Sequence, residues 1–329
     1  MSQTATYERQ YKRYKELVEK SLAGAVKEQS PRSLYDPLKY VLDAGGKRIR
    51  PVLLLLSCEA VGGDPKNALH ACAAIEILHN FTLVHDDIMD HAQSRRGRRT
   101  VHTKWDTNVA ILVGDELLAL AYRTLLQTKS PHIQEIAKIF TEGVVEVCEG
   151  QAYDKEFETR LAVSVDEYLL MIEKKTAKMV AVAAEIGGLV GSGQRSAVQA
   201  LRRYGEHVGR AFQIQDDLLD IVGNERELGK AIGGDLVEGK KTFLLLEALR
   251  RARGQDKELL RNVVTKKRRV ADRIPEYRRI YHETGAIDAA RCRIEEDISK
   301  AKRELSRLPS SGAQAMLGWF ADMLLNRTY

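Results

Sequence analysis

Apolar positions recur every three to four residues along almost the whole chain, as in the series Leu201, Tyr204, Val208 and Phe212. This spacing puts apolar side chains on one face of an α-helix, whereas the strict alternation typical of strands is scarce. The chain also has only 7 prolines in 329 residues, which favours long helices. The pattern predicts an all-α protein with helices near residues 7–28, 34–43, 51–61, 67–90, 107–127, 133–150, 166–190, 195–221, 241–252, 256–268, 275–283, 284–306 and 312–326.

Glycine pairs mark the ends of several of these helices, at residues 45–46, 62–63, 187–188 and 233–234. Two stretches, 91–106 and 222–240, are predicted to be ordered but irregular loops. We find no low-complexity linker and no short-period repeat in the sequence. Residues 1–329 are therefore predicted to form a single domain.

Two predicted helices are apolar on most sides. They are ACAAIEILHNFTLV at residues 71–84 and AKMVAVAAEIGGLV at residues 177–190. A helix that is apolar nearly all round belongs in the centre of a bundle. Burying an unpaired polar group costs a few kcal/mol, so the polar residues on these helices require an explanation.

The first of these helices ends in an acidic cluster. Asp86 and Asp90 are four residues apart on one helix face, and Asp87 lies between them. His79 and Glu76 extend the same polar stripe toward the helix start. Carboxylates this close repel one another unless cations neutralise them, and carboxylate oxygens suit Mg²⁺. A single DDxxD segment is equally compatible with a solvated acidic helix end.

The acidic spacing recurs 130 residues later. Asp216, Asp217 and Asp220 repeat it, and Gln213 lies one turn before Asp216. Two such clusters facing each other across a bundle would hold a polyanion through metal ions. The recurrence therefore favours a metal site to which both aspartate trios contribute carboxylates.

A polyanion site also needs fixed positive groups. The turn Gly45-Gly46-Lys47-Arg48-Ile49-Arg50-Pro51 precedes a predicted helix, with Pro51 suited to its first position. Backbone N–H groups at a helix start, together with Lys47 and Arg50, suit phosphate. A solvated loop explains this turn equally well when it is considered alone.

Further basic residues lie in both predicted loops and inside one helix. The loop after the first aspartates carries Arg95, Arg96, Arg98 and Arg99, whose side-chain forks match diphosphate oxygens or form a solvated surface. The loop after the second cluster carries Lys230 and Lys240. Lys174, Lys175 and Thr176 interrupt the second apolar helix, so at least one lysine faces inward or extends to solvent. The basic stretch 250–273 is interpreted as a solvated helix face, with loose membrane attraction as the alternative.

Composition limits the other classes of function. The net charge of +6 is small and scattered, so nucleic-acid binding is not expected. The four cysteines have no paired spacing, which indicates inert thiols rather than a zinc site or a disulfide framework. The first twenty residues lack the apolar core of a signal peptide, and no apolar run reaches the length of a membrane span. A cytoplasmic protein with no transmembrane segment is therefore expected.

Seven motifs, in register over nearly the whole chain, resemble the trans-isoprenyl diphosphate synthases, the polyprenyl synthetase family. They are GGKRIRP at 45–51, LHNFTLVHDDIMD at 78–90, RRG at 95–97, GQAYD at 150–154, KKT at 174–176, FQIQDDLLD at 212–220 and GKAIGGDLVEGKKT at 229–242. The resemblance implies a bundle of antiparallel helices around a deep central cavity, usually in a homodimer. It also implies a prenyltransferase that condenses isopentenyl diphosphate with dimethylallyl, geranyl or farnesyl diphosphate.

The resemblance implies a role for each site residue. Both aspartate trios would bind three Mg²⁺ ions, with Mn²⁺ as a substitute, around the allylic diphosphate. Asp87, Asp154, Asp220 and Asp235 would orient metal-bound water. Isopentenyl diphosphate would contact Lys47, Arg50, His79 and Arg96, and the allylic diphosphate would contact Arg95, Lys175, Lys230 and Lys240. Thr176 and Gln213 would stabilise the developing carbocation with their oxygen dipoles.

Product length should depend on what fills the cavity below the first aspartates. Phe81 is five residues before Asp86 and so about 7–8 Å deeper along the helix, and the smaller Thr82 follows it. In the family this pattern implies geranylgeranyl diphosphate as product. The alternative is that Phe81 is ordinary core packing, with farnesyl or longer polyprenyl diphosphates as products.

Two further alternatives share the fold. A class I terpene cyclase typically replaces the second aspartate motif and lacks the isopentenyl diphosphate contacts, whereas this chain has DDLLD and GGKRIRP. A non-catalytic subunit of a heteromeric synthase usually loses aspartates, whereas all six are present here. Both alternatives are therefore disfavoured.

Overall fold

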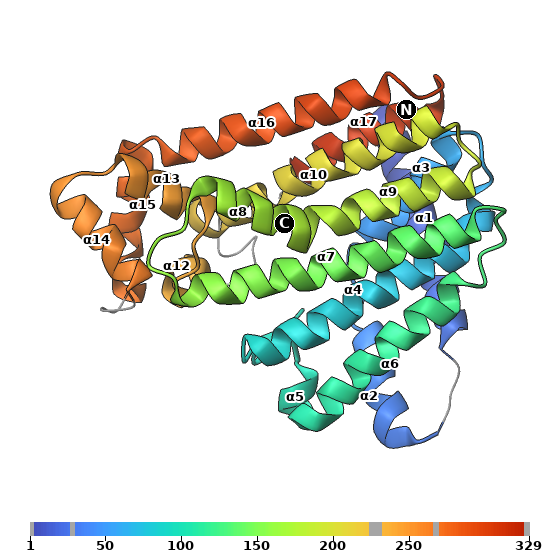
Figure 1. Ribbon diagram of the computed structural model, residues 1–329, viewed down its shortest axis with the longest axis horizontal. Coiled ribbons are helices and arrows are strands. Elements are labelled where there is room, and N and C mark those ends of the chain that lie inside the picture. The colour runs from blue at the N-terminus through green and yellow to red at the C-terminus, as the bar shows by residue number, and fades with distance from the viewer. Residues whose placement is uncertain (1–2, 27–29, 224–231, 266–269, 326–329) are drawn as a thin grey trace. The chain divides into compact units, whose positions relative to one another are not determined.

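The prediction of an all-α protein is confirmed by a computed structural model, which describes residues 3–26, 30–223, 232–265 and 270–325 (Figure 1). Most long helices begin and end within a few residues of the predicted positions, but the helix predicted over 133–150 continues to Thr159. The long helices are α1 Gln3–Ala25, α2 Arg32–Leu42, α3 Ile49–Ala60, α4 Leu69–Met89, α6 Thr107–Leu125, α7 Ile133–Thr159, α8 Val165–Ile172, α9 Lys178–Val190, α10 Arg195–Val222, α13 Phe243–Arg251, α14 Gly254–Val264, α15 Ile274–Glu283, α16 Ala286–Leu305 and α17 Gly312–Leu325.

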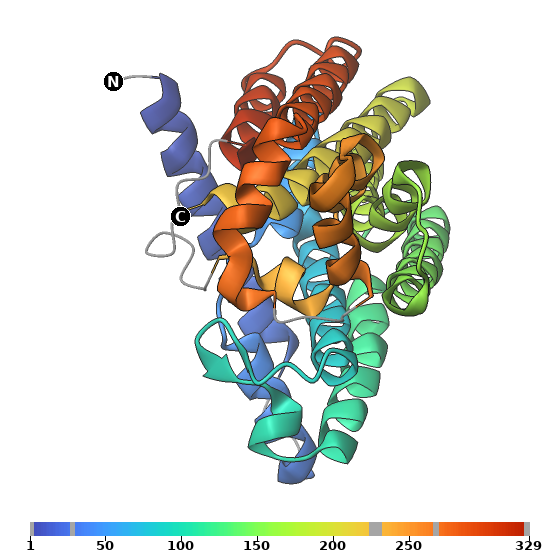
Figure 2. The same ribbon diagram turned by 90° about the vertical axis from the view of Figure 1, so that its left-hand side faces the viewer.

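The short elements are the 3₁₀ helices η1 Pro65–Ala68 and η3 Ala271–Arg273, the π-helical turn η2 Glu173–Ala177, the helices α5 Val101–Lys104 and α12 Gly234–Glu238, and the strands β1 Ser94–Arg95 and β2 Arg98–Arg99. The two strands pair as an antiparallel hairpin, drawn as short arrows in Figure 2. Each predicted irregular loop therefore contains regular structure: the hairpin and α5 in 91–106, and α12 in 222–240.

The chain divides into two compact units. The first comprises residues 1–140, 183–199 and 308–317, and the second comprises residues 141–182, 200–307 and 318–329. Helices α7, α9, α10 and α17 contribute residues to both units. The prediction of one domain over 1–329 and that of a deep central cavity therefore stay predictions.

Helix α4 forms the centre of the first unit. It packs against α1, α3 and α6, and its residues from Ala71 to Leu78 are all buried. Helix α3 is equally buried over Val52–Cys58. Burial of an aliphatic side chain stabilises the fold by roughly 1.5–3 kcal/mol, so α4 is anchored firmly along its length. Its polar carboxyl-terminal turn is thereby fixed in position.

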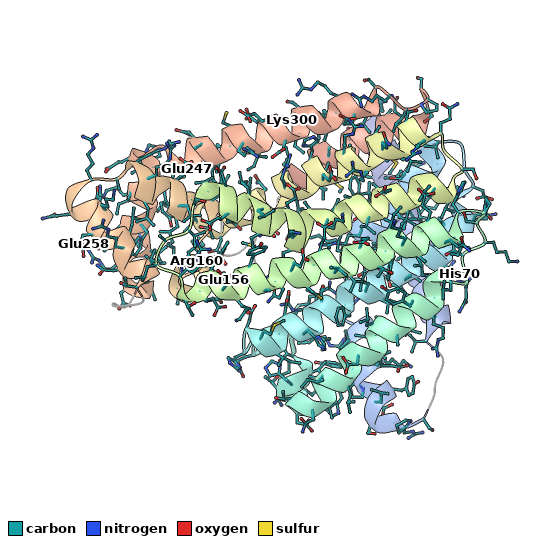
Figure 3. All side chains as sticks on the ribbon, in the orientation of Figure 1. His70, Glu156, Arg160, Glu247, Glu258 and Lys300 are labelled. Carbon is teal, nitrogen blue, oxygen red and sulfur yellow. The ribbon has the colours of Figure 1, made fainter. Side chains whose placement is uncertain are left out.

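In the second unit, α13 packs against α8, α14, α15 and α16. Figure 2 shows this unit from the side of α14 and α15. The tyrosines Tyr168, Tyr277 and Tyr281 are buried there, and the carboxylate of Asp297 on α16 is fully buried as well. Figure 3 labels Glu156 and Arg160 at the end of α7, where they form a surface ion pair of 3.5 Å.

Two local predictions require correction or comment. Helix α3 begins at Ile49, so Pro51 is its third residue rather than its first. Proline is tolerated there because the first-turn N–H groups have no partner within the helix.

None of the four cysteines forms a disulfide; Cys58 and Cys72 are buried, whereas Cys148 and Cys292 are exposed. Among the described residues, no helix has the length and apolar character needed to cross a membrane.

Candidate active site

The first aspartate trio lies at the carboxyl end of α4. Asp86 is half-buried, Asp87 is buried and Asp90 is exposed. The carboxylate of Asp87 accepts a hydrogen bond of 2.7 Å from Nε of Arg95. Burial raises the pKa of Asp87, and the charge of Arg95 offsets part of that increase. Asp86 and Asp90 thus face outward while Asp87 is tied to the hairpin, as expected for two metal ligands and one supporting residue.

The hairpin directs its arginines to different partners. Its turn is Arg96-Gly97, with φ angles of 53° and 72°, the left-handed conformations that a two-residue hairpin turn requires. Arg95 reaches Asp87, while the Arg96 guanidinium donates to the carbonyl of Gly45 and lies against Gly46. The hairpin therefore connects the acidic cluster to the glycine turn.

The other two arginines of the hairpin are held by its own neighbourhood. The Arg98 guanidinium stacks on the ring of Tyr40 at 3.9 Å, and the Tyr40 hydroxyl donates to the carbonyl of Arg99 at 2.9 Å. Arg99 itself donates to the carbonyl of Thr103. We therefore interpret Arg98 and Arg99 as structural residues.

The glycine turn contains three cations with different surroundings. Lys47 is exposed, and its carbonyl accepts a hydrogen bond of 2.5 Å from Tyr11. Arg48 is buried and pairs with Glu76 at 2.6 Å and Glu19 at 2.8 Å. Arg50 is half-buried, and its guanidinium lies 3.4 Å from Nε2 of His79. Arg48 thus neutralises the buried Glu76, whereas Lys47 is exposed on the turn and Arg50 lies beside His79.

His79 lies where these positive groups meet. Burial, followed by the charges of Arg50, Arg96, Arg95 and Arg48, lowers its pKa well below the usual value. The imidazole is therefore neutral at physiological pH, and Nε2 accepts from Arg50, because a guanidinium can only donate. The predicted isopentenyl diphosphate contacts Arg50, His79 and Arg96 are thus brought together, with Lys47 on the adjoining turn.

The second aspartate trio is buried more deeply on α10. Asp217 accepts hydrogen bonds from Tyr168 at 2.6 Å and from Gln213 at 3.0 Å. The amide oxygen of Gln213 accepts in turn from the hydroxyl of Thr176 at 2.9 Å. Thr176, Gln213, Asp217 and Tyr168 therefore form one hydrogen-bonded chain, and the role of Thr176 and Gln213 toward a carbocation stays a prediction.

Negative charge accumulates around Asp217. Burial raises its pKa to about 7, and the neighbouring Asp235 and Asp216 add to this effect, while the bonds from Tyr168 and Gln213 oppose it. Asp220 accepts a hydrogen bond of 3.0 Å from the backbone N–H of Asp235. Lys240 lies 3.8 Å from Asp235 and 2.7 Å from Glu238. The four carboxylates 216, 217, 220 and 235 thus form one acidic cluster.

Lys175 is paired with Asp154 at 2.6 Å, so two more predicted residues meet in the second unit. Lys174 faces away, toward Glu149 at 2.6 Å. Lys230 lies outside the described residues. The two aspartate trios belong to different units, so their meeting across one cavity stays a prediction.

The predicted chain-length residues lie on α4. Phe81 is buried, and its ring centroid is 4.8 Å from that of His85. The hydroxyl of Thr82 donates to the carbonyl of His79 at 2.8 Å, inside the same helix. Phe81 thus lies on a buried part of α4, five residues before Asp86, and the role of Phe81 and Thr82 in product length stays a prediction.

The sequence analysis missed three residues around these clusters. Tyr168 donates to Asp217, Tyr281 is a buried phenol whose pKa is raised by burial and by Asp235, and Arg48 neutralises Glu76. A signal existed for Tyr168, since it precedes Lys175 by two helical turns. Burial of Tyr281 and Arg48 depends on packing that no local spacing reveals.

Comparison with known proteins identifies the family. The sequence model of the family described as "Polyprenyl synthetase" matches residues 31–281, a span that includes both aspartate trios. The chain belongs to the polyprenyl synthetase family. This assignment confirms the prediction of a prenyltransferase of the short-chain trans type.

Individual relatives of this family match nearly end to end. The chain is 39% identical over 321 residues to a short chain isoprenyl diphosphate synthase of Methanothermobacter thermautotrophicus, covering 97% of this chain and 98% of the relative. A crystal structure of geranylgeranyl pyrophosphate synthetase from Pyrococcus horikoshii superimposes with a TM-score of 0.92 at 36% identity, covering 98% and 99% of the two chains.

A third relative in the family is a polyprenyl synthase from Caulobacter crescentus, whose crystal structure contains calcium and isoprenyl diphosphate. It has a TM-score of 0.85 and 29% identity, and covers 99% of this chain and 95% of its own. These similarities along the chain confirm the isoprenoid synthase type of fold.

Proposed function

We propose that this polyprenyl synthetase condenses isopentenyl diphosphate with a short allylic diphosphate and releases diphosphate. The observation that carries the proposal is the environment of His79. A neutral imidazole among Arg50, Arg96 and Arg95, adjacent to the glycine turn, forms a site for an anion with several oxygens. This site lies on the same helix as Asp86 and Asp90.

The acidic clusters suit a divalent cation with oxygen ligands. Burial is the main cause that raises the pKa of Asp217 to about 7, and the charges of Asp235 and Asp216 contribute, so a cation beside these carboxylates would be favoured. Among the described residues, no three acidic, histidine or cysteine side chains are close enough to hold an ion by themselves. This fits Mg²⁺, which keeps several waters and shares substrate phosphate oxygens with one or two carboxylates.

Asp86, Asp90 and Asp216 would hold these ions, with Asp87, Asp220 and Asp235 as supporting residues. We infer Mg²⁺, three ions per site as in the family resemblance, with Mn²⁺ as a substitute. Bound there, the metal would stabilise negative charge on the departing diphosphate.

The protein groups supply the rest of the chemistry. The allylic C–O bond breaks, and charge grows on the leaving oxygens, toward which Lys175 is held by Asp154. The Thr176 hydroxyl donates a hydrogen bond to the amide oxygen of Gln213, so the lone pairs of the Thr176 oxygen remain for the carbocation. The double bond of isopentenyl diphosphate then attacks the cation, and the departed diphosphate accepts the final proton.

We propose geranylgeranyl diphosphate as the product. Phe81 is buried and braced by the His85 ring, so its side chain has little freedom to yield to a longer chain. The similarity to a geranylgeranyl pyrophosphate synthetase along 98% of the chain supports the same length. Farnesyl and longer products are the alternatives that a product assay separates.

We also infer a homodimer. Helix α6 exposes Ile111 and Leu112, and Leu126 follows directly after its last residue; the exposed fractions are 42%, 59% and 61%. An apolar helix face of this kind is commonly covered by a second chain. Size-exclusion chromatography with light scattering should give about twice the mass of 37.0 kDa, and a single-chain mass would contradict the inference.

The function is tested by supplying the purified protein with isopentenyl diphosphate, Mg²⁺ and each short allylic diphosphate in turn. We expect a geranylgeranyl product after dephosphorylation and chromatography, and no product with EDTA. Asp86→Ala should lower kcat by on the order of 10²–10³. Asp288→Ala, at an aspartate of α16 whose side chain is 81% exposed, is the matched control and should retain activity. Absence of product with every allylic substrate would contradict the proposal.

A further inference from the structure

One continuous helix changes its form at the residues that the proposed function uses. Between α8 and α9, Glu173–Ala177 forms a π turn, in which the N–H of Lys178 donates to the carbonyl of Glu173. Such turns hold one residue more than an α turn, are rare, and often occur at functional sites. This turn carries Lys175 and Thr176. Figure 1 shows α8 and the start of α9 running alongside α7.

The extra residue changes which side chains share a face. Tyr168 and Thr176 are eight residues apart, whereas two turns of a regular α-helix take about 7.2 residues. Regular geometry would therefore rotate one away from the other by about 80°. With one turn widened by a residue, eight residues complete about two turns.

The two side chains consequently reach the same partner helix. Tyr168 donates to Asp217 at 2.6 Å and Thr176 donates to Gln213 at 2.9 Å, and these two acceptors are one turn apart on α10. Without the π turn, one of the two bonds to α10 would be lost. The hydrogen-bonded chain of the second aspartate cluster therefore depends on this local helix form.

An ion-pair network holds Glu173, the first residue of the turn. The Arg210 guanidinium on α10 donates to Glu173 at 3.1 Å and to Asp297 on α16 at 2.7 Å. Asp297 is fully buried and is also bonded to His207 at 3.0 Å and Arg293 at 3.2 Å. A guanidinium fork between two carboxylates fixes both distance and direction.

Two glycines let neighbouring helices press directly on the turn. A Cβ at Gly150 of α7 would lie 2.3 Å from the backbone nitrogen of Lys175, and a Cβ at Gly209 of α10 would lie 2.4 Å from Cα of Ala177. Backbone atoms cannot yield to such contacts as flexible side chains do. The turn is thus enclosed on both sides by backbone.

We propose that Arg210, anchored by Asp297, is a positioning residue that holds Glu173–Ala177 in its π form and so places Lys175 and Thr176 for reaction. Because Gly150 and Gly209 have no side chain, α7 and α10 can approach the π turn as closely as this form requires. The catalytic roles of Lys175 and Thr176 rest on the proposed function. The clamp, which is the pair of bonds from Arg210 to Glu173 and Asp297, is inferred from the contacts above. Arg210 acts through Glu173 and has no substrate contact in this role.

The test compares matched pairs of variants. Arg210→Met and Glu173→Gln remove the clamp, and Arg202→Met removes an ion pair of 2.6 Å with Glu206 on the same helix, α10. Gly209→Ala obstructs the turn, whereas Gly205→Ala obstructs α9 one turn later, where a Cβ would lie 2.6 Å from Cα of Ala181. Thermal unfolding of each variant records its stability separately.

We expect Arg210→Met, Glu173→Gln and Gly209→Ala to lower kcat by about tenfold or more, because a displacement near 1 Å can cost on the order of 10²-fold. KM for isopentenyl diphosphate should stay within about twofold, since its contacts lie on α3, α4 and the hairpin. The control variants should keep wild-type kcat even where their melting temperature falls. If the clamp variants lose stability but retain kcat, the positioning role is overturned.

A second readout does not depend on activity. Deuterium uptake at the amides of residues 174–179 should rise in Arg210→Met and Glu173→Gln but not in Arg202→Met. Unchanged uptake would overturn the clamp. If Arg210→Met fails to fold, Glu173→Gln carries the test, because its side chain is 47% exposed. If the wild-type protein forms no product, the proposed function fails, while the exchange comparison still decides the clamp.

Discussion

The phenol of Tyr168 donates a hydrogen bond of 2.6 Å to Oδ2 of Asp217, and both side chains are buried. This bond supports the ionised form of a carboxylate whose pKa burial raises to about 7. A buried hydroxyl thus helps keep Asp217 negative beside Asp235 and Asp216, where a cation is expected. The relationship leads to the first prediction.

Tyr168→Phe should lower the free energy of unfolding by about 1.5–3 kcal/mol, the usual contribution of a hydrogen bond to a charged group. It should also raise the Mg²⁺ concentration needed for half-maximal activity, because the Asp217 carboxylate loses a donor and is protonated more readily. Urea unfolding and a Mg²⁺ titration measure the two effects. An unchanged Mg²⁺ requirement would contradict the second.

Tyr281→Phe is the matched control. Tyr281 is fully buried in the same unit, and its hydroxyl has no hydrogen-bond partner among the described residues. Removing an unsatisfied buried hydroxyl should leave stability unchanged or raise it slightly. A loss as large as that of Tyr168→Phe would show that removing a buried hydroxyl, and not breaking the bond to Asp217, accounts for both results.

Asp297 should contribute to stability in a defined pH range. Burial alone would raise its pKa, but hydrogen bonds from His207 and Arg210 and the charge of Arg293 lower it from the ordinary 3.8 to about 2. A depressed pKa in the folded state stabilises above the unfolded value, and the contribution is lost as pH falls toward the folded value. Asp297→Asn should therefore cost about 2 kcal/mol at pH 7.

The difference between wild-type protein and Asp297→Asn should shrink as pH falls from about 4 to 2. Chemical denaturation at a series of pH values measures it. Asp288→Asn, an exposed residue of the same helix whose side chain is 81% exposed, should leave stability almost unchanged throughout. A constant difference across the acidic range would refute the linkage.

The four thiols should fall into two reactive classes. Burial raises the pKa of Cys58 to about 12 and that of Cys72 well above its usual value, whereas Cys148 and Cys292 are exposed. Because the thiolate is the reactive form, only the two exposed thiols should react readily with a disulfide reagent near pH 8. Counting released thiol before and after denaturation checks this, and rapid reaction of all four would contradict the burial.

Phe81→Ala should lengthen the product beyond geranylgeranyl diphosphate, because it opens the space below the first aspartates. Chromatography of the dephosphorylated products measures the length. Phe140→Ala removes another buried ring of the same unit, packed on Tyr122 at 5.1 Å, and should leave the product unchanged. Both variants should lose about 3–5 kcal/mol of stability. An unchanged product in Phe81→Ala would exclude Phe81 as the floor.

The helices and the site residues with local spacing were predictable from the sequence. Helices α4 and α10 each place an aspartate trio at the end of an apolar or amphipathic stripe, and a period of 3.6 residues reveals both. The family motifs imply roles for Thr176, Gln213, Lys175 and Asp154, but neither the motifs nor their spacing predicts the bond of Thr176 to Gln213 or the ion pair of Lys175 with Asp154. The sequence indicates these site residues because they are polar at helix positions where the 3.6-residue period would place apolar side chains.

Other features depended on packing between distant segments. Lys47, Arg48 and Arg50 look alike in sequence, yet only Arg48 is buried, because the long-range partners Glu19 and Glu76 reach it. The sequence pattern predicts a regular helix at Glu173–Ala177, where the structure has a π turn, because one additional residue leaves an apolar pattern nearly intact. The hairpin at 94–99 was read as irregular, because two-residue strands are too short to show alternation.

The hairpin has a mechanical consequence. With two residues in each strand, the hairpin has little stability of its own, and its conformation depends on the contacts that its arginines make. Arg95 forms an ion pair with Asp87, and Arg96 donates a hydrogen bond to the carbonyl of Gly45. Loss of either interaction should therefore weaken the other. Because the Arg95 side chain is 37% exposed, salt weakens its grip. High ionic strength should therefore relax the acidic and basic sides of the pocket in concert, so that affinity for both diphosphates declines together.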